Sequence, residues 1–309
     1  MTKEEFSYKS ADQLTNIHAI KWIPDQEINA ILQISHGVTE HIDRYNELAE
    51  FLTSKGILVV GNDHLGHGKS LGKEMYFGGP GSWNYIVQDI ERCRQLIIND
   101  YPDVPYFMLG FSLGSFALRT HLIDYPKDLS GAIIVGTGYT STLEIFLAKL
   151  VVKSEERKYG AENTTPKIKE LTFGTYNKLF PNPKTDYDWL SLSEENLADY
   201  TADPLRGEAM TVGLFRELLD GMNYTGKFKN IKKMNQNIPI LLLSGTKDPV
   251  GNQTKGVKKV AQLFRKNFQS DVTVKFYEDL RHDVLHENSK LEIYNYLLDW
   301  INNHIIETI

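Results

Sequence analysis

The chain has 309 residues, and its 41% hydrophobic and 24% charged residues are ordinary values for a globular protein. The formal net charge of −6 excludes the strongly basic surface that nucleic-acid binding requires, so we expect no nucleic-acid partner. A chain of this length buries enough apolar surface to fold without a disulfide or a structural metal.

Short apolar runs alternate with helical patterns along most of the chain. Residues 5–25 predict two strands around a turn at 11–13, and further strands are expected at 30–35, 57–60, 106–109, 132–135, 238–243 and 272–277. Helical spacing is found at 45–54, 85–99, 113–125, 253–268 and 290–305. Because these strands are apolar throughout, they indicate a mostly parallel sheet of about eight strands with helices on both faces.

Residues 139–229 interrupt this alternation and are too many for a loop. Apolar side chains recur there at helical spacing, at Leu143, Phe146, Leu147, Leu150 and Val151. We therefore predict an α/β core formed by residues 1–138 and 230–309, with a helical cap inserted at 139–229. The apolar face of the cap is expected either to bind substrate through Phe146, Leu147 and Leu150 or to pack against the sheet.

A G-x-S-x-G motif at 110–114 stands between a predicted strand and a predicted helix. This context predicts a tight elbow that presents Ser112 as a nucleophile, with room for the turn only because Gly110 and Gly114 lack side chains. The N–H of Leu113 then lies at the start of a helix, where it can stabilise an oxyanion.

A serine hydroxyl needs a neighbouring base before it can attack. In folds that carry this elbow, an acid and then a histidine follow the serine along the chain. Asp248 and His282 follow successive predicted strands, and both are expected at the carboxyl edge of the sheet. We therefore predict that His282 is the general base and that Asp248 orients it.

Two neighbours of His282 are alternatives. His286 could serve as the base, and it is expected near the start of the last helix. Asp283 could serve as the acid, but adjacent side chains point apart, so we expect an exposed loop residue with a structural role.

A second oxyanion donor is expected in the loop that follows an early strand. Residues 36–41 fit this position, with the N–H of Val38 as the donor. The histidine pairs in this loop and at 64 and 67 lack the spacing of zinc ligands, so we expect neither a metal nor another cofactor. These histidines are expected to be hydrogen-bonded loop residues.

The cellular setting is indicated by three features. The single cysteine, Cys93, can form no internal disulfide, which favours a reducing compartment. The N-terminus is charged and has no apolar signal core. No run approaches the ~20 apolar residues that span a bilayer. We expect a cytoplasmic protein.

Taken together, these motifs resemble the monoacylglycerol lipase and lysophospholipase branch of the α/β-hydrolases. Residues 36–45 are similar to the family's H-G-x-x-E-H…R-Y segment, and residues 63–70 to its D-x-x-G-H-G-x-S loop. Residues 281–287 resemble R-H-E-x-L-N-E, which favours His282 over His286 as the base. The resemblance implies the α/β-hydrolase fold. One departure is Thr39, where the family often has glycine.

The expected function is therefore hydrolysis of carboxylic esters through an acyl-enzyme. The expected substrate is a single-chain lipid ester, a lysophospholipid or a monoacylglycerol, with transient contact between the cap and a membrane surface. An aminopeptidase is an alternative, in which cap carboxylates hold a substrate ammonium; candidates are Glu155, Glu156, Glu194 and Glu195. A third hypothesis is a non-catalytic binding protein. The complete set of serine, acid and histidine counts against it.

Overall fold

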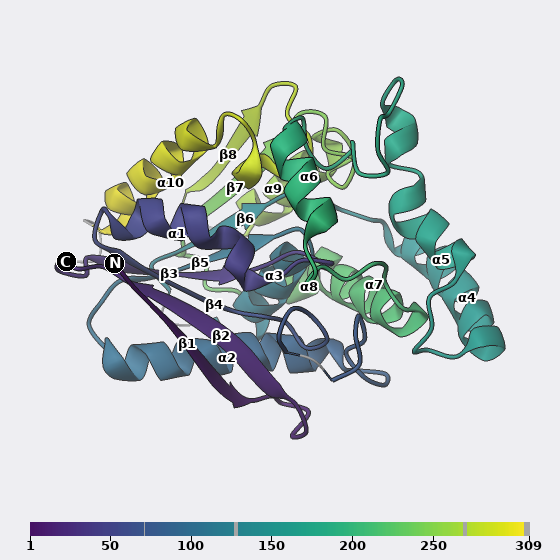
Figure 1. The fold of residues 1–309 in the computed structure, drawn as a ribbon, viewed down its shortest axis with the longest axis horizontal. Coiled ribbons are helices and arrows are strands. Elements are labelled where there is room, and N and C mark those ends of the chain that lie inside the picture. Colours follow the sequence, from purple (N-terminus) through teal and green to yellow (C-terminus); the bar gives the residue numbers. More distant parts are fainter. Residues whose placement is uncertain (71, 127–128, 268–270, 306–309) are drawn as a thin grey trace.

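An eight-stranded sheet forms the centre of the computed structural model, which describes residues 1–70, 72–126, 129–267 and 271–305 (Figure 1). The strand order is β1-β2-β4-β3-β5-β6-β7-β8. The β1–β2 and β2–β4 pairs are antiparallel, and the other five pairs are parallel. The prediction of a mostly parallel sheet of about eight strands is thus confirmed.

The strands are β1 (Thr2–Lys9), β2 (Asn16–Ile23), β3 (Ala30–Ser35), β4 (Ile57–Asn62), β5 (Tyr106–Phe111), β6 (Gly131–Val135), β7 (Ile240–Gly245) and β8 (Val272–Tyr277). The helices are α1 (Asn46–Thr53), α2 (Trp83–Asp100), α3 (Leu113–Asp124), α4 (Thr142–Tyr159), α5 (Pro166–Lys169), α6 (Glu194–Ala202), α7 (Val212–Gly226), α8 (Phe228–Ile231), α9 (Lys255–Arg265) and α10 (Lys290–Ile305). Strand β7 begins two residues later than predicted, directly after Pro239, which has no N–H to donate. The predicted end of the helix at 253–268 lies outside the described residues.

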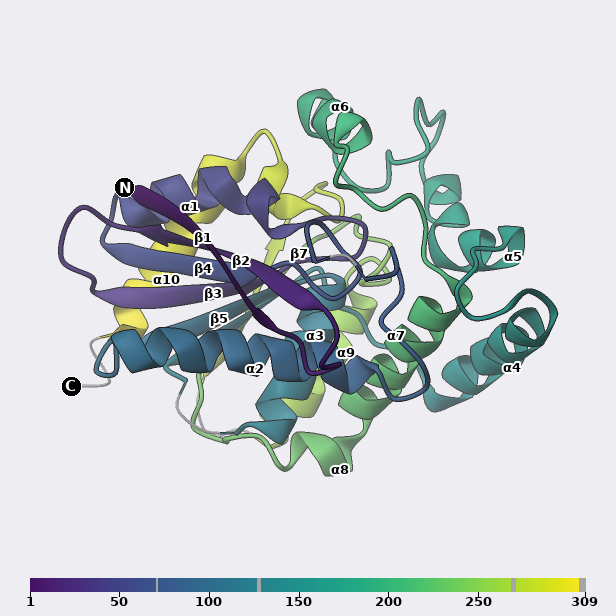
Figure 2. The same ribbon diagram turned by 60° about the horizontal axis from the view of Figure 1, so that its bottom comes forward.

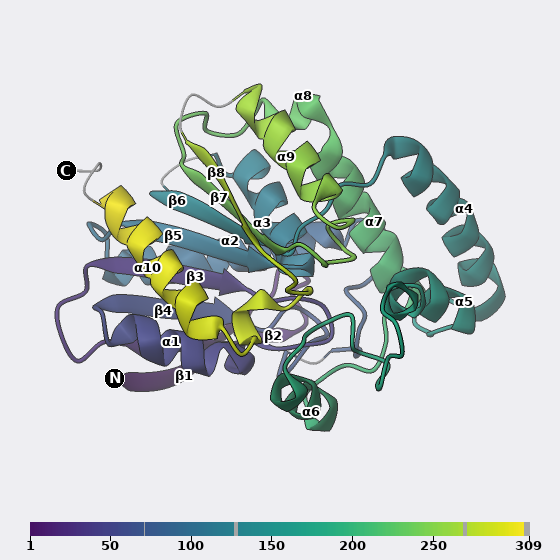
Figure 3. The same cartoon turned by 90° about the horizontal axis from the view of Figure 1, so that it is seen from above.

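Alternate residues along the strands enter two separate hydrophobic cores. On β5, Met108 belongs to the core shared with α2, α3 and α9, whereas Leu109 belongs to the core shared with α1 and α10. Figure 3 shows these two groups of helices on opposite sides of the sheet. Both faces of the central strands are therefore covered, which explains why every residue of β3, β4, β5, β6 and β7 is buried.

A buried carboxylate, Asp89 of α2, holds the turn between β1 and β2 by accepting hydrogen bonds from Ser10 Oγ (2.7 Å) and from the N–H of Ala11 (2.6 Å). Burial raises the pKa of Asp89 from 3.8 to about 6. The folded protein therefore binds this proton more tightly than the unfolded chain, and folding gains stability from this group as the pH falls through 6.

We expect Asp89→Asn to remove this pH dependence. Between about pH 7.5 and pH 5, the free energy of unfolding of the wild type should rise relative to that of the variant by roughly 1 kcal/mol. Urea unfolding of both proteins at the two pH values measures the difference. A constant difference would contradict a raised pKa at Asp89.

Helices α4 to α8 all lie in the chain between β6 and β7. In Figure 2, α4, α5 and α6 lie beyond one end of the sheet, away from the helices that flank its faces. Helix α7 differs, because it packs against α2 and α3 of the core as well as against α4. Its buried Glu217 accepts a hydrogen bond from the N–H of Trp83, at the start of α2 (2.9 Å). The boundaries at 138/139 and 229/230 stay a prediction.

The apolar stripe predicted on α4 is not part of the core. Exposed fractions are 67% for Leu143, 57% for Phe146, 54% for Leu147 and 51% for Leu150. The buried residues of α4 are instead Ile145 and Val152. The alternative in which the stripe packs against the sheet is therefore wrong, since α4 lies outside α7 and only a narrow strip of its surface is covered.

The described part of the chain contains no helix that is both long enough and apolar enough to cross a bilayer.

Candidate active site

The elbow between β5 and α3 presents Ser112 in a strained backbone conformation, with φ 52° and ψ −117°. A Cβ added at Gly110 would collide with the carbonyl of Gly114, and one added at Gly114 would collide with the carbonyl of Ser35 on β3. Glycine is thus needed at both positions for steric reasons. Ser112 itself is only partly buried.

Three predicted site residues come together at the carboxyl ends of β5, β7 and β8. Ser112 Oγ lies 2.9 Å from His282 Nε2, and His282 Nδ1 lies 2.9 Å from Asp248 Oδ1. His282 and Asp248 are almost completely buried, with exposed fractions of 1% and 0%. With the Nδ1 proton directed at Asp248, His282 Nε2 is free to accept the proton of the serine hydroxyl.

The surroundings hold this pair of side chains in place. Asp248 Oδ1 also accepts a hydrogen bond from the N–H of Val250 (2.8 Å), which fixes the carboxylate. A Cβ at Gly136 would lie 2.9 Å from His282 Cε1, so a glycine is required where β6 ends. The rings of Phe111 and Trp189 lie 4.9 Å and 5.4 Å from the imidazole, centre to centre.

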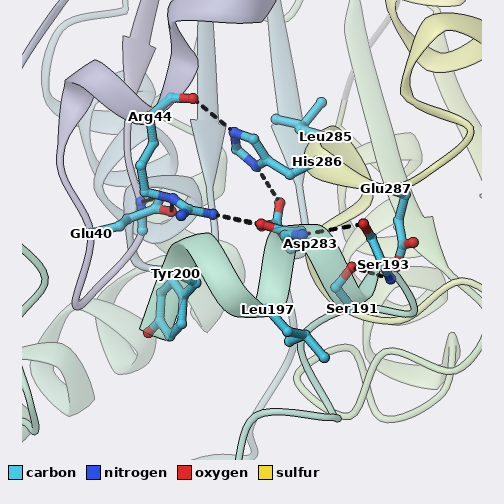
Figure 4. Close-up of polar contacts among 12 residues, drawn as sticks. Glu40, Arg44, Ser191, Ser193, Leu197, Tyr200, Asp283, Leu285, His286 and Glu287 are labelled. Carbon is cyan, nitrogen blue, oxygen red and sulfur yellow. Dashed lines mark hydrogen bonds and ion pairs between the residues drawn. The ribbon is translucent and has the colours of Figure 1, made fainter. Parts of the chain in front are cut away.

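His286 is engaged elsewhere. Its Nδ1 lies 2.8 Å from Asp283 Oδ1, and its Nε2 lies 3.0 Å from the carbonyl of Arg44 (Figure 4). Both ring nitrogens therefore have partners other than Ser112. This arrangement favours His282 as the base.

Asp283 corrects one expectation, because it is not an exposed loop residue. Its exposed fraction is 1%. Its Oδ2 accepts hydrogen bonds from Arg44 Nη2 (3.3 Å) and Asn196 Nδ2 (3.2 Å), in addition to the contact with His286 (Figure 4). Burial acts to raise the pKa of Asp283, but His286 and Arg44 outweigh it and hold the pKa below its ordinary value. The residue is an ionised, structural carboxylate in the loop after β8, next to His282.

The loop after β3 places the N–H of Val38 as a hydrogen-bond donor. His36 Nε2 accepts a hydrogen bond from the N–H of His64 (2.9 Å), so the ring proton is on Nδ1, which donates to the carbonyl of Gly37 (2.7 Å). That carbonyl shares its peptide unit with the Val38 N–H, whose orientation is thereby fixed. Within the described residues, the structure gives this N–H no acceptor.

Three histidines of the two loops, His36, His64 and His67, are buried and neutral. Burial and the neighbouring His64 and His67 hold the pKa of His36 well below its ordinary value. Burial lowers the pKa of His64 to about 3 and that of His67 to about 4. Among the residues that the structure describes, no group of three or more histidine, cysteine or acidic side chains could hold a metal ion.

An aromatic cluster from the segment between β6 and β7 lies against the site, and no sequence pattern predicts it. Trp189 stacks on Phe173 and contacts both Tyr176 and the His282 ring. The proximity of Trp189 to His282 depends on how the segment between β6 and β7 folds, so the local sequence does not reveal it. The predicted substrate-binding residues Phe146, Leu147 and Leu150 lie instead on the exposed face of α4.

Known proteins share both the sequence pattern and the fold. Residues 26–289 match the sequence profile of the family described as serine aminopeptidase, S33. The chain is 25% identical to the monoacylglycerol lipase of Mycolicibacterium smegmatis, over 98% of this chain and 99% of that protein. It is 28% identical to the monoglyceride lipase of Mus musculus, over 92% of this chain and 84% of that protein.

A solved structure agrees with these relatives. A thermostable carboxyl esterase from Bacillus coagulans, in complex with glycerol, has a TM-score of 0.91 and 27% identity, and 99% of each chain is covered. The fold, the elbow and the match to most of the chain establish that this protein belongs to the serine aminopeptidase S33 family of α/β-hydrolases and is similar to its monoacylglycerol lipases.

Proposed function

We propose that the protein is a serine hydrolase that cleaves the ester of a single-chain lipid through an acyl-enzyme. The observation that carries this proposal is the pair of 2.9 Å contacts that join Ser112, His282 and Asp248. Ser112 Oγ attacks the ester carbonyl while His282 accepts its proton and then protonates the leaving alcohol. His282 then takes a proton from water, which attacks the acyl carbonyl; the bond to Ser112 Oγ breaks, the proton passes to Oγ, and the fatty acid leaves.

The N–H groups of Val38 and Leu113 are proposed to bind the oxyanion of the tetrahedral intermediate. Leu113 is the first residue of α3, so its N–H lies at a helix N-terminus. The helix dipole stabilises negative charge at this end. The Val38 peptide is oriented by His36. Each donor of this kind is typically worth about 10² to 10³ in rate.

The proposed substrate class is a monoacylglycerol or a lysophospholipid. The names of the relatives support an ester of this kind, and the complex of the Bacillus coagulans esterase with glycerol fits an alcohol of that size. The exposed apolar face of α4 is proposed to receive the acyl chain from a lipid surface. Leu150 borders a surface hollow that is also lined by Lys153, Arg157 and Lys158, a combination suited to transient contact with an anionic membrane.

An aminopeptidase is the second candidate, because the family description names one. The cap carboxylates that would hold a substrate ammonium are partly occupied: Glu194 pairs with Lys184, and Glu156 pairs with Arg216. Glu194 is also 82% exposed at its side chain, as expected for a solvated surface group. These contacts favour the esterase.

A substrate screen separates these two activities. The purified protein is assayed with p-nitrophenyl esters of increasing chain length and, in parallel, with aminoacyl anilides. We expect hydrolysis of the esters, with kcat/KM rising several-fold per added CH₂ until the acyl site is full, because each buried CH₂ contributes roughly 0.8 kcal/mol. Hydrolysis confined to the anilides would establish the peptidase instead.

Phe146→Asp tests whether the α4 face receives the acyl chain. We expect roughly a tenfold loss of kcat/KM for a long-chain ester and little change for the acetate ester, because a charge replaces apolar contact area. The thermal midpoint should hold, since Phe146 is 57% exposed. Leu291→Asp, at an equally exposed apolar position on α10, is the matched control. A stable Phe146→Asp protein with an unchanged chain-length profile would exclude this role for α4.

A further inference from the structure

Helix α6 contacts both loops that border the proposed site. Figure 4 shows this helix beside Arg44 and Asp283. Asn196 donates a hydrogen bond to Asp283 in the loop after β8 (3.2 Å). The hydroxyl of Tyr200 lies 2.6 Å from Thr39 Oγ1 in the loop after β3. Arg44 stands between them: its guanidinium lies 5.1 Å from the centre of the Tyr200 ring, and its Nη2 lies 3.0 Å from Asn196 Oδ1. One cap helix is therefore in polar contact with both loops.

Thr39 is held in a conformation that its side chain disfavours. It is a β-branched residue with φ 61°, and its exposed fraction is 2%. Such a left-handed conformation costs on the order of 1 to 3 kcal/mol and persists only where surrounding contacts enforce it. The contacts made by the Thr39 hydroxyl are therefore candidates for holding the loop in shape.

The direction of these contacts follows from proton counting. The Thr39 hydroxyl donates to the carbonyl of Val38 (2.6 Å), which uses its single proton. The hydroxyl of Tyr200 must then donate to Thr39 Oγ1. Burial raises the pKa of Tyr200, so the phenol keeps this proton at neutral pH. A relay of two short hydrogen bonds thus runs from α6 to the backbone of Val38.

Three consecutive peptide units around Val38 are held by three different groups. Glu40 accepts from the N–H of Gly37 (2.5 Å), and His36 donates to the carbonyl of Gly37 (2.7 Å). The third unit, at the carbonyl of Val38, is held by Thr39. All three groups belong to the loop itself, and Thr39 is the one that accepts a hydrogen bond directly from a side chain of α6, Tyr200.

We propose that Tyr200 is a positioning residue for the oxyanion hole: through Thr39 it fixes the backbone of Val38, and it thereby couples the seating of cap helix α6 to stabilisation of the transition state. This inference rests on the proposed function, in which the Val38 N–H binds the oxyanion. Loss of the Tyr200 hydroxyl would loosen the loop after β3 while leaving the hydrogen bonds among Ser112, His282 and Asp248 in place.

The test is a double-mutant cycle of Tyr200→Phe and Thr39→Val on a short, water-soluble ester. Each variant removes one hydroxyl and keeps the shape of the side chain. We expect each to lower kcat about tenfold, a part of the 10² to 10³ that a complete donor supplies. KM should change less than threefold. The kcat of the double variant should equal that of the less active single variant, because both substitutions break the same relay.

Two further variants identify the hydroxyl as the group that matters. Thr39→Ser keeps the hydroxyl and should restore the wild-type kcat. Tyr187→Phe is the matched control, because Tyr187 packs edge-on against Tyr200 and accepts a hydrogen bond from Arg206. Its kcat should stay unchanged. A purely structural role for Tyr200 predicts the opposite pattern, a lowered thermal midpoint with an unchanged kcat at 25 °C, and that result would overturn the proposal.

A fluorophosphonate separates failure of this inference from failure of the proposed function, because its phosphoryl oxygen enters the same oxyanion hole. A wild-type protein that does not react with the reagent would remove the proposed function and this inference with it. A wild type that reacts, together with a Tyr200→Phe variant that reacts equally fast, would overturn only the role of Tyr200. We expect labelling of the variant to be slower by about the same factor as kcat.

Discussion

Replacement of Ser112 by alanine is expected to lower kcat by roughly 10⁴-fold or more, and His282→Ala should lower it to a similar extent. The two side chains act as one unit through their 2.9 Å contact, so the double variant should be hardly worse than either single variant. Ser112→Ala should leave the thermal midpoint nearly unchanged, whereas His282→Ala should lower it, because it leaves the buried Asp248 without this partner. Turnover of a p-nitrophenyl ester and a thermal melt measure the two quantities.

Two neighbouring substitutions are the controls for this assignment. His286→Ala and Asp283→Asn should keep activity within about tenfold of the wild type, because neither side chain contacts Ser112. Both should lower the thermal midpoint, because each disrupts the buried ionic cluster around Asp283. An inactive His286→Ala protein, together with an active His282→Ala protein, would transfer the role of general base to His286.

Gly114→Ala is expected to have the largest effect on stability. In an ordinary helix this change is favourable, but here the added methyl group meets the carbonyl of Ser35 and lies 2.5 Å from that of His36. Both obstacles are backbone atoms of β3 and its following loop, which cannot move aside as a flexible side chain can. We expect a loss of at least about 3 kcal/mol in the free energy of unfolding, and loss of activity as the elbow is forced away from the loop.

Gly226→Ala serves as the matched helical control. A Cβ at this position, the last residue of α7, would lie 3.7 Å from Tyr139 Cε2, which is an ordinary contact. Urea unfolding should therefore give a stability equal to or slightly above that of the wild type. A Gly114→Ala protein with wild-type stability and turnover would contradict the predicted clash with the Ser35 carbonyl.

Much of the fold could be predicted from the sequence because its signals are local. The central strands are nearly continuous apolar runs, and the elbow is a pentapeptide between a strand and a helix. The steric reason for Gly110 is local, but that for Gly114 comes from the distant backbone of Ser35 and His36. The positions of Ser112, Asp248 and His282 follow from strand ends, since parallel strands bring their carboxyl ends to one edge. The structure brings these three residues within hydrogen-bond distance in series, and their catalytic roles stay a prediction.

The features that the sequence analysis missed depend on partners far away in the chain. Asp283 looked like an exposed loop residue, but Arg44 and Asn196 cover it from positions 239 and 87 residues away. On α4, the spacing predicted a helix correctly, but it could not tell which side would be covered. The covered side is Ile145 and Val152, because α7 rather than the sheet is the neighbour.

The shared packing of α7 has a consequence for recombination among related enzymes. In the chain this helix belongs to the insertion between β6 and β7. Its side chains nevertheless pack on α2: Glu217 accepts a hydrogen bond from the N–H of Trp83, and a Cβ at Gly221 would collide with the Trp83 ring. An exchange of the whole insertion would therefore remove the contacts that α7 makes with α2 and α3. A chimera that crosses over at Thr211, the N-cap of α7, keeps these contacts and transfers α4 to α6 as a module. The natural unit of exchange is thus shorter than the insertion seen along the sequence.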